Sequence, residues 1–161
     1  MDTARWMPYL VMGGVMVVVA GAGILATDIG PWYRDLRKPS WQPPDWLFGP
    51  AWTTIYVFII ASVGLAWNAA PGGVHGAIVL VTGVNMLLNI AWSFLFFKFR
   101  RPPWSLVEVV PLWLSIVAMM VVFGEHHPLA AWLLTPYLAW VTFAAYLNLT
   151  IVRLNRSARP A

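Results

Sequence analysis

Two kinds of residue are scarce in this sequence, cysteine and charged side chains, and each shortage excludes a class of protein. With no cysteine, the chain has no disulfide framework, no thiolate metal ligand and no thiol nucleophile. Charged residues make up only 10% of the 161 residues, whereas a water-soluble domain carries about 25%, because its surface must be hydrated. Hydrophobic residues make up 60%. We therefore expect a lipid bilayer to be the natural solvent of this chain.

Five apolar stretches are each long enough to cross a bilayer as a helix, which takes about 20 residues. They cover about residues 6–27, 47–70, 76–97, 104–124 and 129–152. Only one charged residue, Glu108, falls inside any of them. Turn-forming residues such as Pro71-Gly72-Gly73 separate the stretches, and the alternating pattern of barrel strands is absent. The sequence predicts an all-α fold, a single integral membrane bundle of five transmembrane helices over residues 1–161, with a long loop at 28–46.

Lysine and arginine are concentrated in alternate connections, which predicts the orientation in the membrane. The N-terminus and the loops near residues 71–75 and 125–128 hold only Arg5. The first loop, the third connection and the tail hold the rest, namely Arg34, Arg37, Lys38, Lys98, Arg100, Arg101, Arg153, Arg156 and Arg159. Since positively charged segments stay in the cytosol, we expect an outside N-terminus, with the first loop and the C-terminus cytosolic. In a bacterium this would be the inner or plasma membrane.

Aromatic and polar residues within the spans recur at helical spacing, so they share faces. A belt at the membrane interface explains tryptophans near span ends, but Trp113 and Trp140 lie near mid-span. The faces combine Trp52 with Tyr56, Asn85 and Asn89 with Trp92, and Tyr137 and Trp140 with Ala144 and Asn148. Aromatic walls with a few polar groups are what a flat apolar ligand needs, and the small Ala144 would leave space for it.

The polar residues of these faces have two interpretations. Amide and carboxyl groups are costly in hydrocarbon, so we expect Asn89, Asn148 and Glu108 to point into the bundle, towards a ligand in its cytosolic half. Alternatively, the asparagines are hydrogen-bond partners between helices. Glu108, one turn into its helix, could equally be a partly hydrated carboxylate that is favoured near a helix N-terminus.

The first loop is unusually rich in tryptophan and proline. From Trp32 to Tyr56 it reads W-Y-x-x-L-x-K-P-S-W-x-P-P-x-W-x-x-G-P-x-W-x-x-x-Y. Prolines fix backbone angles and remove N–H donors, so we expect a stiff, extended loop. Its aromatic side chains should pack onto the cytosolic mouth of the bundle and form a lid.

This motif resembles the hallmark of the TspO/MBR family of tryptophan-rich sensory proteins, translocator proteins and peripheral benzodiazepine receptors. Three later segments agree in order: Leu88-Asn89 with Trp92, Trp104 with an acid four residues later, and Pro136-Tyr137-Leu138-Ala139-Trp140 continuing to Leu147-Asn148. The resemblance implies a five-helix membrane protein, commonly dimeric, that binds tetrapyrroles such as protoporphyrin IX. It also implies a ligand pocket under the first loop, lined by Trp41, Trp46, Trp52, Asn89, Trp92, Trp104, Val107, Trp140, Ala144 and Leu147.

Together these observations favour a receptor or sensor for porphyrins or related hydrophobic ligands, with Tyr56, Glu108 and Asn148 added to the ligand site. We expect no required cofactor and no metal site, since the three histidines lie in loops on the opposite side. The expected partners are membrane lipid, the ligand and a second copy of the chain, not nucleic acid. One alternative is a light- and oxygen-dependent porphyrin-degrading enzyme that uses Trp52 and Trp140. Another is a porphyrin or lipid transporter.

Overall fold

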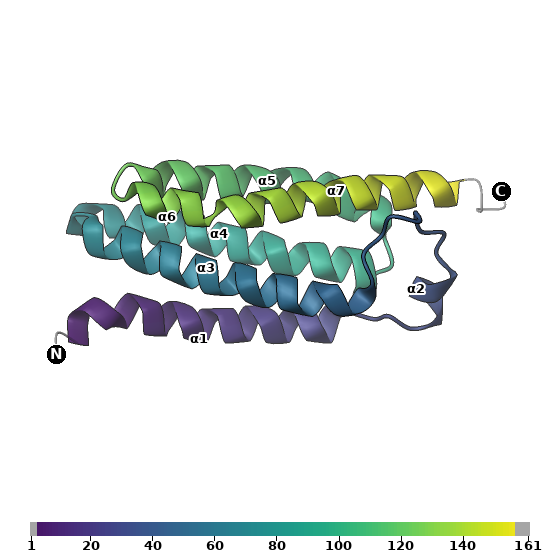
Figure 1. Ribbon diagram of the computed structural model, residues 1–161, viewed down its shortest axis with the longest axis horizontal. Helices are drawn as coiled ribbons and strands as arrows, with labels where there is room; N and C mark the ends of the chain where they lie inside the picture. The colour runs from purple at the N-terminus through teal and green to yellow at the C-terminus, as the bar shows by residue number, and fades with distance from the viewer. Residues whose placement is uncertain (1–2, 157–161) are drawn as a thin grey trace.

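The computed structural model describes residues 3–156, which form a bundle of long helices lying side by side (Figure 1). The helices are α1 (Thr3–Ala26), α2 (Pro31–Asp35), α3 (Phe48–Ala69), α4 (His75–Ser93), α5 (Pro102–Gly124), α6 (Pro128–Leu133) and α7 (Thr135–Asn155). Within residues 3–156 there is no strand. Five helical segments are long and apolar enough to cross a membrane: Thr3–Ala26, Asp45–Ala69, Gly72–Lys98, Pro102–Gly124 and Pro128–Asn155. The predicted all-α fold with five transmembrane helices is confirmed.

Two of the spans are less regular than their apolar runs suggested. At the end of the third span, the residues that follow α4 form a π-helical turn, η3 (Phe94–Lys98), before the chain reverses. The last span is broken into α6 and α7 at Leu134, because Pro136 cannot donate a backbone hydrogen bond to the preceding turn. The first loop also differs from the extended segment that its prolines suggested, since Pro31 begins the short helix α2.

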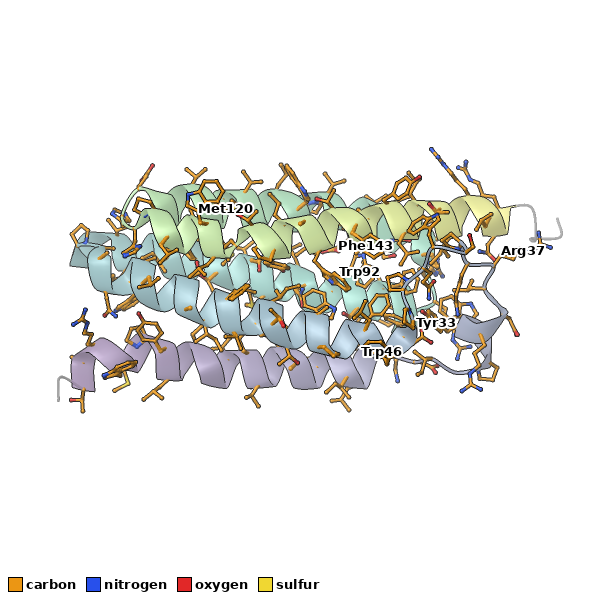
Figure 2. The ribbon with its side chains drawn as sticks, viewed as in Figure 1. Tyr33, Arg37, Trp46, Trp92, Met120 and Phe143 are labelled. Atoms are coloured by element: carbon orange, nitrogen blue, oxygen red, sulfur yellow. The ribbon has the colours of Figure 1, made fainter. Side chains whose placement is uncertain are left out.

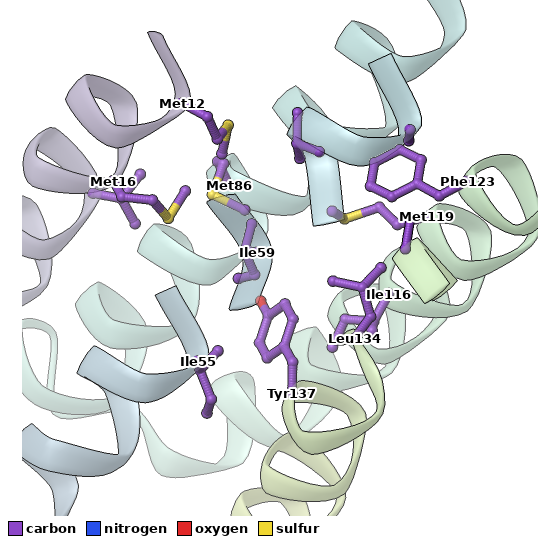
Figure 3. Close-up of a cluster of buried hydrophobic side chains, with 14 of the residues drawn as sticks. Met12, Met16, Ile55, Ile59, Met86, Ile116, Met119, Phe123, Leu134 and Tyr137 are labelled. Atoms are coloured by element: carbon purple, nitrogen blue, oxygen red, sulfur yellow. The ribbon is translucent and has the colours of Figure 1, made fainter. Parts of the chain in front are cut away.

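Helix α5 lies between α4 and α7, while α1 packs at one side of the bundle, mainly on α3. The core between these helices is apolar, with Ile59, Ile116 and Phe123 almost completely buried (Figure 3). The Tyr9 ring of α1 covers Gly64 of α3, and a Cβ atom at Gly64 would overlap this ring. Glycine at this position therefore allows the two helices to meet.

The two ends of the bundle differ in charge. The N-terminus, the turn before α4 and the turn before α6 lie at one end, which we call the N-terminal end (Figure 1). The first loop, the α4–α5 connection and the end of α7 lie at the other, the loop end. Among the described residues the loop end carries Arg34, Arg37, Lys38, Lys98, Arg100, Arg101, Arg153 and Arg156, against Arg5 at the N-terminal end. Arg159, the ninth expected cation, lies outside the described residues.

Candidate functional site

A buried hydrogen-bond network joins α4, α5 and α7 near the middle of the bundle. The amide of Asn85 donates to Ser115 Oγ (2.8 Å) and accepts from the Tyr137 hydroxyl (3.2 Å). That hydroxyl in turn accepts from Asn89 Nδ2 (3.2 Å). Asn85 and Tyr137 are almost completely buried. Asn85 and the Nδ2 group of Asn89 therefore act as hydrogen-bond partners between helices, which was the alternative that the sequence left open.

Two helical turns closer to the loop end, the faces of α4 and α5 that carry Asn85 and Ser115 also carry Trp92 and Glu108. Trp92 is seven residues after Asn85, and Glu108 is seven residues before its partner Ser115. Because α4 and α5 run in opposite directions, these steps bring Trp92 and Glu108 to one level of the bundle. Trp92 Nε1 and both carboxyl oxygens of Glu108 are buried without a hydrogen-bond partner among the described residues. A hydrogen-bond donor and an acceptor pair are thus left unsatisfied at the same depth.

Aromatic rings surround this level of the bundle. The Trp52 ring lies 5.5 Å from that of Tyr56 and 6.0 Å, edge to face, from that of Tyr137. Trp92, labelled in Figure 2, stacks on Phe96 with the ring centroids 5.3 Å apart. Trp140 meets Phe48 at the start of α3, with ring centroids 5.5 Å apart. The structure therefore brings together the predicted residues Trp52, Tyr56, Asn89, Trp92, Glu108 and Trp140, with Ala144 one turn after Trp140 and half-buried.

Other predicted residues lie elsewhere. Trp104 and Val107 point away from the bundle, with 59% and 62% of their surface exposed. Trp46 is 71% exposed and Trp41 43%, although Trp41 stacks on Tyr146 on the outer face of α7 (5.2 Å). These four side chains would meet a ligand only from the outside of a single chain. Their place in the ligand site stays a prediction.

Leu147 and Asn148 are buried in packing contacts. Leu147 belongs to a small apolar cluster with Tyr33, Phe96 and Ile151 beneath the first loop. The Asn148 amide faces α5. In the amide orientation that satisfies all three neighbouring groups, its nitrogen donates to the Pro102 carbonyl (3.1 Å), and its oxygen accepts from Ser105 Oγ (2.9 Å) and from the Leu106 N–H (3.1 Å). Asn148 thus joins α7 to the start of α5.

The first loop packs onto the loop end through Tyr33, which is only 6% exposed. The Tyr33 hydroxyl donates to Asp45 (3.2 Å) and accepts from Gln42 (3.1 Å), and the Lys38 ammonium lies 3.6 Å from the centre of its ring. Burial, with a smaller contribution from the Asp45 carboxylate, raises the pKa of Tyr33 to about 12. The hydroxyl therefore remains a neutral donor at physiological pH and links Asp45 and Gln42 within the first loop.

Two further contacts fasten the loop, and sequence reasoning identified neither. The Asn155 amide makes reciprocal hydrogen bonds with the backbone of Arg37, accepting from its N–H (3.1 Å) and donating to its carbonyl (2.9 Å). Asp28 pairs with Arg100 (3.2 Å), and a hydrogen bond from the Gly30 N–H, with a smaller effect of Arg100, lowers the pKa of Asp28. The ion pair is exposed and contributes little, so Asn155 is the stronger attachment. Asn155 lies seven residues after Asn148, a spacing that could have indicated it.

Known proteins are similar to this chain over most of its length. A sequence model described as the TspO/MBR family matches residues 9–154. Tryptophan-rich protein TspO of Chlorobaculum tepidum is 42% identical over 140 residues, covering 84% of this chain and 87% of the relative. The translocator protein of Homo sapiens is 40% identical over 131 residues, covering 80% and 77%. A tryptophan-rich sensory protein of Cereibacter sphaeroides is 32% identical over 155 residues, covering 96% and 94%. The chain is an integral membrane protein that belongs to the TspO/MBR family.

Proposed function

We propose that this protein is a membrane receptor or sensor that binds a porphyrin, protoporphyrin IX, between its helices in the loop-end half. The observation that carries the proposal is the pair of buried polar groups without a protein partner among the described residues, the Trp92 indole N–H and the Glu108 carboxyl. Native proteins leave few buried polar groups unpaired, so each needs an explanation such as a missing ligand. A ligand with both N–H donors and acceptor atoms would satisfy the two groups together.

The surroundings of these two groups suit a flat macrocycle. Trp52, Tyr56 and Trp140 offer ring faces for stacking. The propionates of a porphyrin would reach towards the loop, where Arg34 and Arg37 are exposed. Lys38 is the less available cation, because it is held over the Tyr33 ring.

A metal-free porphyrin fits this proposal best. His75 begins α4, and His126 and His127 lie between α5 and α6, so all three are at the N-terminal end. No imidazole is therefore near the proposed site to bind an axial position. The name of the Cereibacter sphaeroides relative describes a sensory protein, which supports the receptor role. The name translocator protein, carried by the human relative, keeps transport of such a ligand as an alternative.

Degradation of the porphyrin under light and oxygen is the second candidate. The observation that favours it is the contact of the Trp52 ring with two tyrosine rings, those of Tyr56 and Tyr137. Such a group of oxidisable rings could pass on the oxidising equivalents that a photoexcited porphyrin and oxygen generate. Trp140 would lie at the other side of the ligand.

Titration of the purified protein with protoporphyrin IX in the dark tests the proposal. We expect quenching of tryptophan fluorescence, and binding weakened about fivefold or more by Trp140→Phe, which removes stacking surface, or by Ala144→Thr, which fills space. Trp132→Phe is the control, because Trp132 is 71% exposed at the N-terminal end. Unchanged affinity in both site variants would refute this pocket. Illumination of the same samples should produce a new bilin-like absorbance only if the protein degrades the porphyrin.

We propose further that the loop end faces the cytosol and that the N-terminus lies outside; in a bacterium the membrane would be the inner or plasma membrane. The support is the accumulation of positive charge at the loop end among the described residues. A reporter enzyme fused to the C-terminus should be active only in its cytosolic form, and extracytoplasmic activity would reverse the orientation. We also propose a homodimer, and the mass of the detergent-solubilised particle distinguishes it from a monomer.

A further inference from the structure

A short segment of the first loop, residues 33–37, lies over the candidate ligand site. Its Tyr33 is buried in an apolar cluster with Phe96, and Leu36 packs on the same cluster. The ring of Trp92, whose N–H is one of the unpaired polar groups of the site, also packs against this cluster. Figure 2 shows Trp92, Tyr33 and Arg37 in this order towards the loop end. A ligand at the level of Trp92 that leaves through the loop end must therefore displace this segment.

Most polar contacts of the first loop hold the loop together and do not attach it to the bundle. The Tyr33 hydroxyl, for example, bonds to two side chains of the same loop. Among the described residues, the loop has hydrogen bonds or ion pairs to the rest of the bundle at two points. One is the exposed Asp28–Arg100 pair before α2, and the other is the Asn155 side chain of α7 on Arg37. Only the second is made by residues 33–37 themselves.

The Asn155 amide matches the backbone of Arg37. Its oxygen accepts from the Arg37 N–H (3.1 Å), and its nitrogen donates to the Arg37 carbonyl (2.9 Å). A carboxamide carries an acceptor and a donor side by side, so it can pair with both backbone groups of one residue. The same nitrogen also donates to the Ile151 carbonyl, one turn earlier in α7 (2.8 Å), which fixes the orientation of the amide. We call the two bonds between Asn155 and Arg37 the Asn155 clasp.

We propose that the Asn155 clasp sets the rates at which the ligand enters and leaves the site, by holding residues 33–37 over Trp92. The inference rests on the proposed function. Asn155 is a positioning residue, because it acts through the loop and does not touch the ligand. The clasp stabilises the closed loop equally with and without ligand, so its loss makes opening more frequent in both states. Entry and exit then become faster together, and the dissociation constant, which is the ratio of their rate constants, stays the same.

Two variants break the clasp and leave the core intact. Asn155→Ala removes the amide, and Asn155→Leu replaces it with an apolar side chain of similar size, in the last turn of α7 and outside the apolar core. Asn68→Ala is the matched control, because its amide also donates to the backbone of a distant residue, the Arg5 carbonyl (3.0 Å), but at the N-terminal end. Trypsin cleavage between Arg37 and Lys38 in the ligand-free protein measures opening of the loop. Stopped-flow quenching of tryptophan fluorescence by protoporphyrin IX gives the association and dissociation rate constants.

Both Asn155 variants should be cleaved after Arg37 about tenfold faster than the wild type. A tenfold change corresponds to about 1.4 kcal/mol, which is a typical net contribution of one or two hydrogen bonds. Both rate constants for protoporphyrin IX should increase about fivefold or more, while the dissociation constant changes by less than about twofold. Asn68→Ala should equal the wild type in all of these measurements.

Faster cleavage with unchanged rate constants would overturn the inference, because the ligand would then pass between the helices from the membrane and not under the loop. Unchanged cleavage would show that the clasp does not hold the loop. A slower association or a weaker affinity in both Asn155 variants would make Asn155 part of the ligand site instead. Absence of protoporphyrin IX binding to the wild type would refute the proposed function and this inference with it, whereas the other outcomes leave the proposed function intact.

Discussion

Replacing Glu108 with leucine should make the protein more stable and, at the same time, weaken its binding of protoporphyrin IX about tenfold. The Glu108 carboxyl oxygens are buried without a partner among the described residues, and a buried polar group in that state costs about 1–3 kcal/mol. An apolar side chain of similar size removes this cost. If the carboxyl accepts hydrogen bonds from the ligand, the same change removes about 1.4 kcal/mol of binding free energy, which corresponds to the tenfold loss.

The opposite signs of the two effects separate a ligand-binding role from a structural one. Replacing a residue that only supports the fold would lower the stability of the protein and its affinity for the ligand together. Thermal unfolding in detergent and dark titration on the same preparation measure both quantities. The same substitution at Glu125, which is exposed at the N-terminal end, should change neither. A less stable Glu108→Leu variant with unchanged affinity would contradict the interpretation of the unpaired Glu108 carboxyl, on which the proposed function rests.

The second large effect is expected for Tyr137→Phe, which should lower the free energy of unfolding by about 2–3 kcal/mol. The hydroxyl of Tyr137 is bonded to both Asn85 and Asn89, and its loss leaves a buried acceptor and a buried donor unpaired. Removing one partner of a buried bond costs about 1–3 kcal/mol for each group that is left. The phenyl ring keeps its contact with Trp52, so the aromatic wall should survive.

Tyr146→Phe provides the matched control for this prediction. Tyr146 lies on the same helix but is 58% exposed, and its ring stacks on Trp41 with or without the hydroxyl. Reversible unfolding in mixed detergent micelles should show the loss for Tyr137→Phe and almost none for Tyr146→Phe. Equal stability of the two variants would mean that the network at mid-span contributes nothing measurable.

The sequence was sufficient for the number of spans and for the two unlike ends of the bundle. A run of about 20 apolar residues has few folded forms open to it in a bilayer, because every backbone N–H and C=O group must be paired within the segment. Charged side chains are costly in hydrocarbon, so most of them lie at the ends of such segments, and their distribution can be read directly from the sequence. The breaks at Pro102 and Pro128 also follow from local chemistry, since proline begins helices well.

The rotation of each helix about its own axis could not be obtained in this way. In a soluble protein the polar face of a helix marks the solvent side, but in a bilayer lipid and core are both apolar and the pattern marks neither. The family resemblance placed Trp104 in the ligand site and its polarity placed Glu108 there, yet the structure turns Trp104 outward and Glu108 inward. The same ambiguity concealed the apolar groove between α1 and α4 that Gly83 helps to line.

The sequence by itself therefore determined that this protein spans a membrane five times and which family motif its first loop carries. Only the tertiary structure decided that Asn85 pairs with Ser115 and that the register of this bond places Trp92 opposite Glu108. The physical reason is that hydrophobic length is a property of each segment alone. The partners of a buried polar group depend on how two helices are aligned, which only their packing against each other establishes.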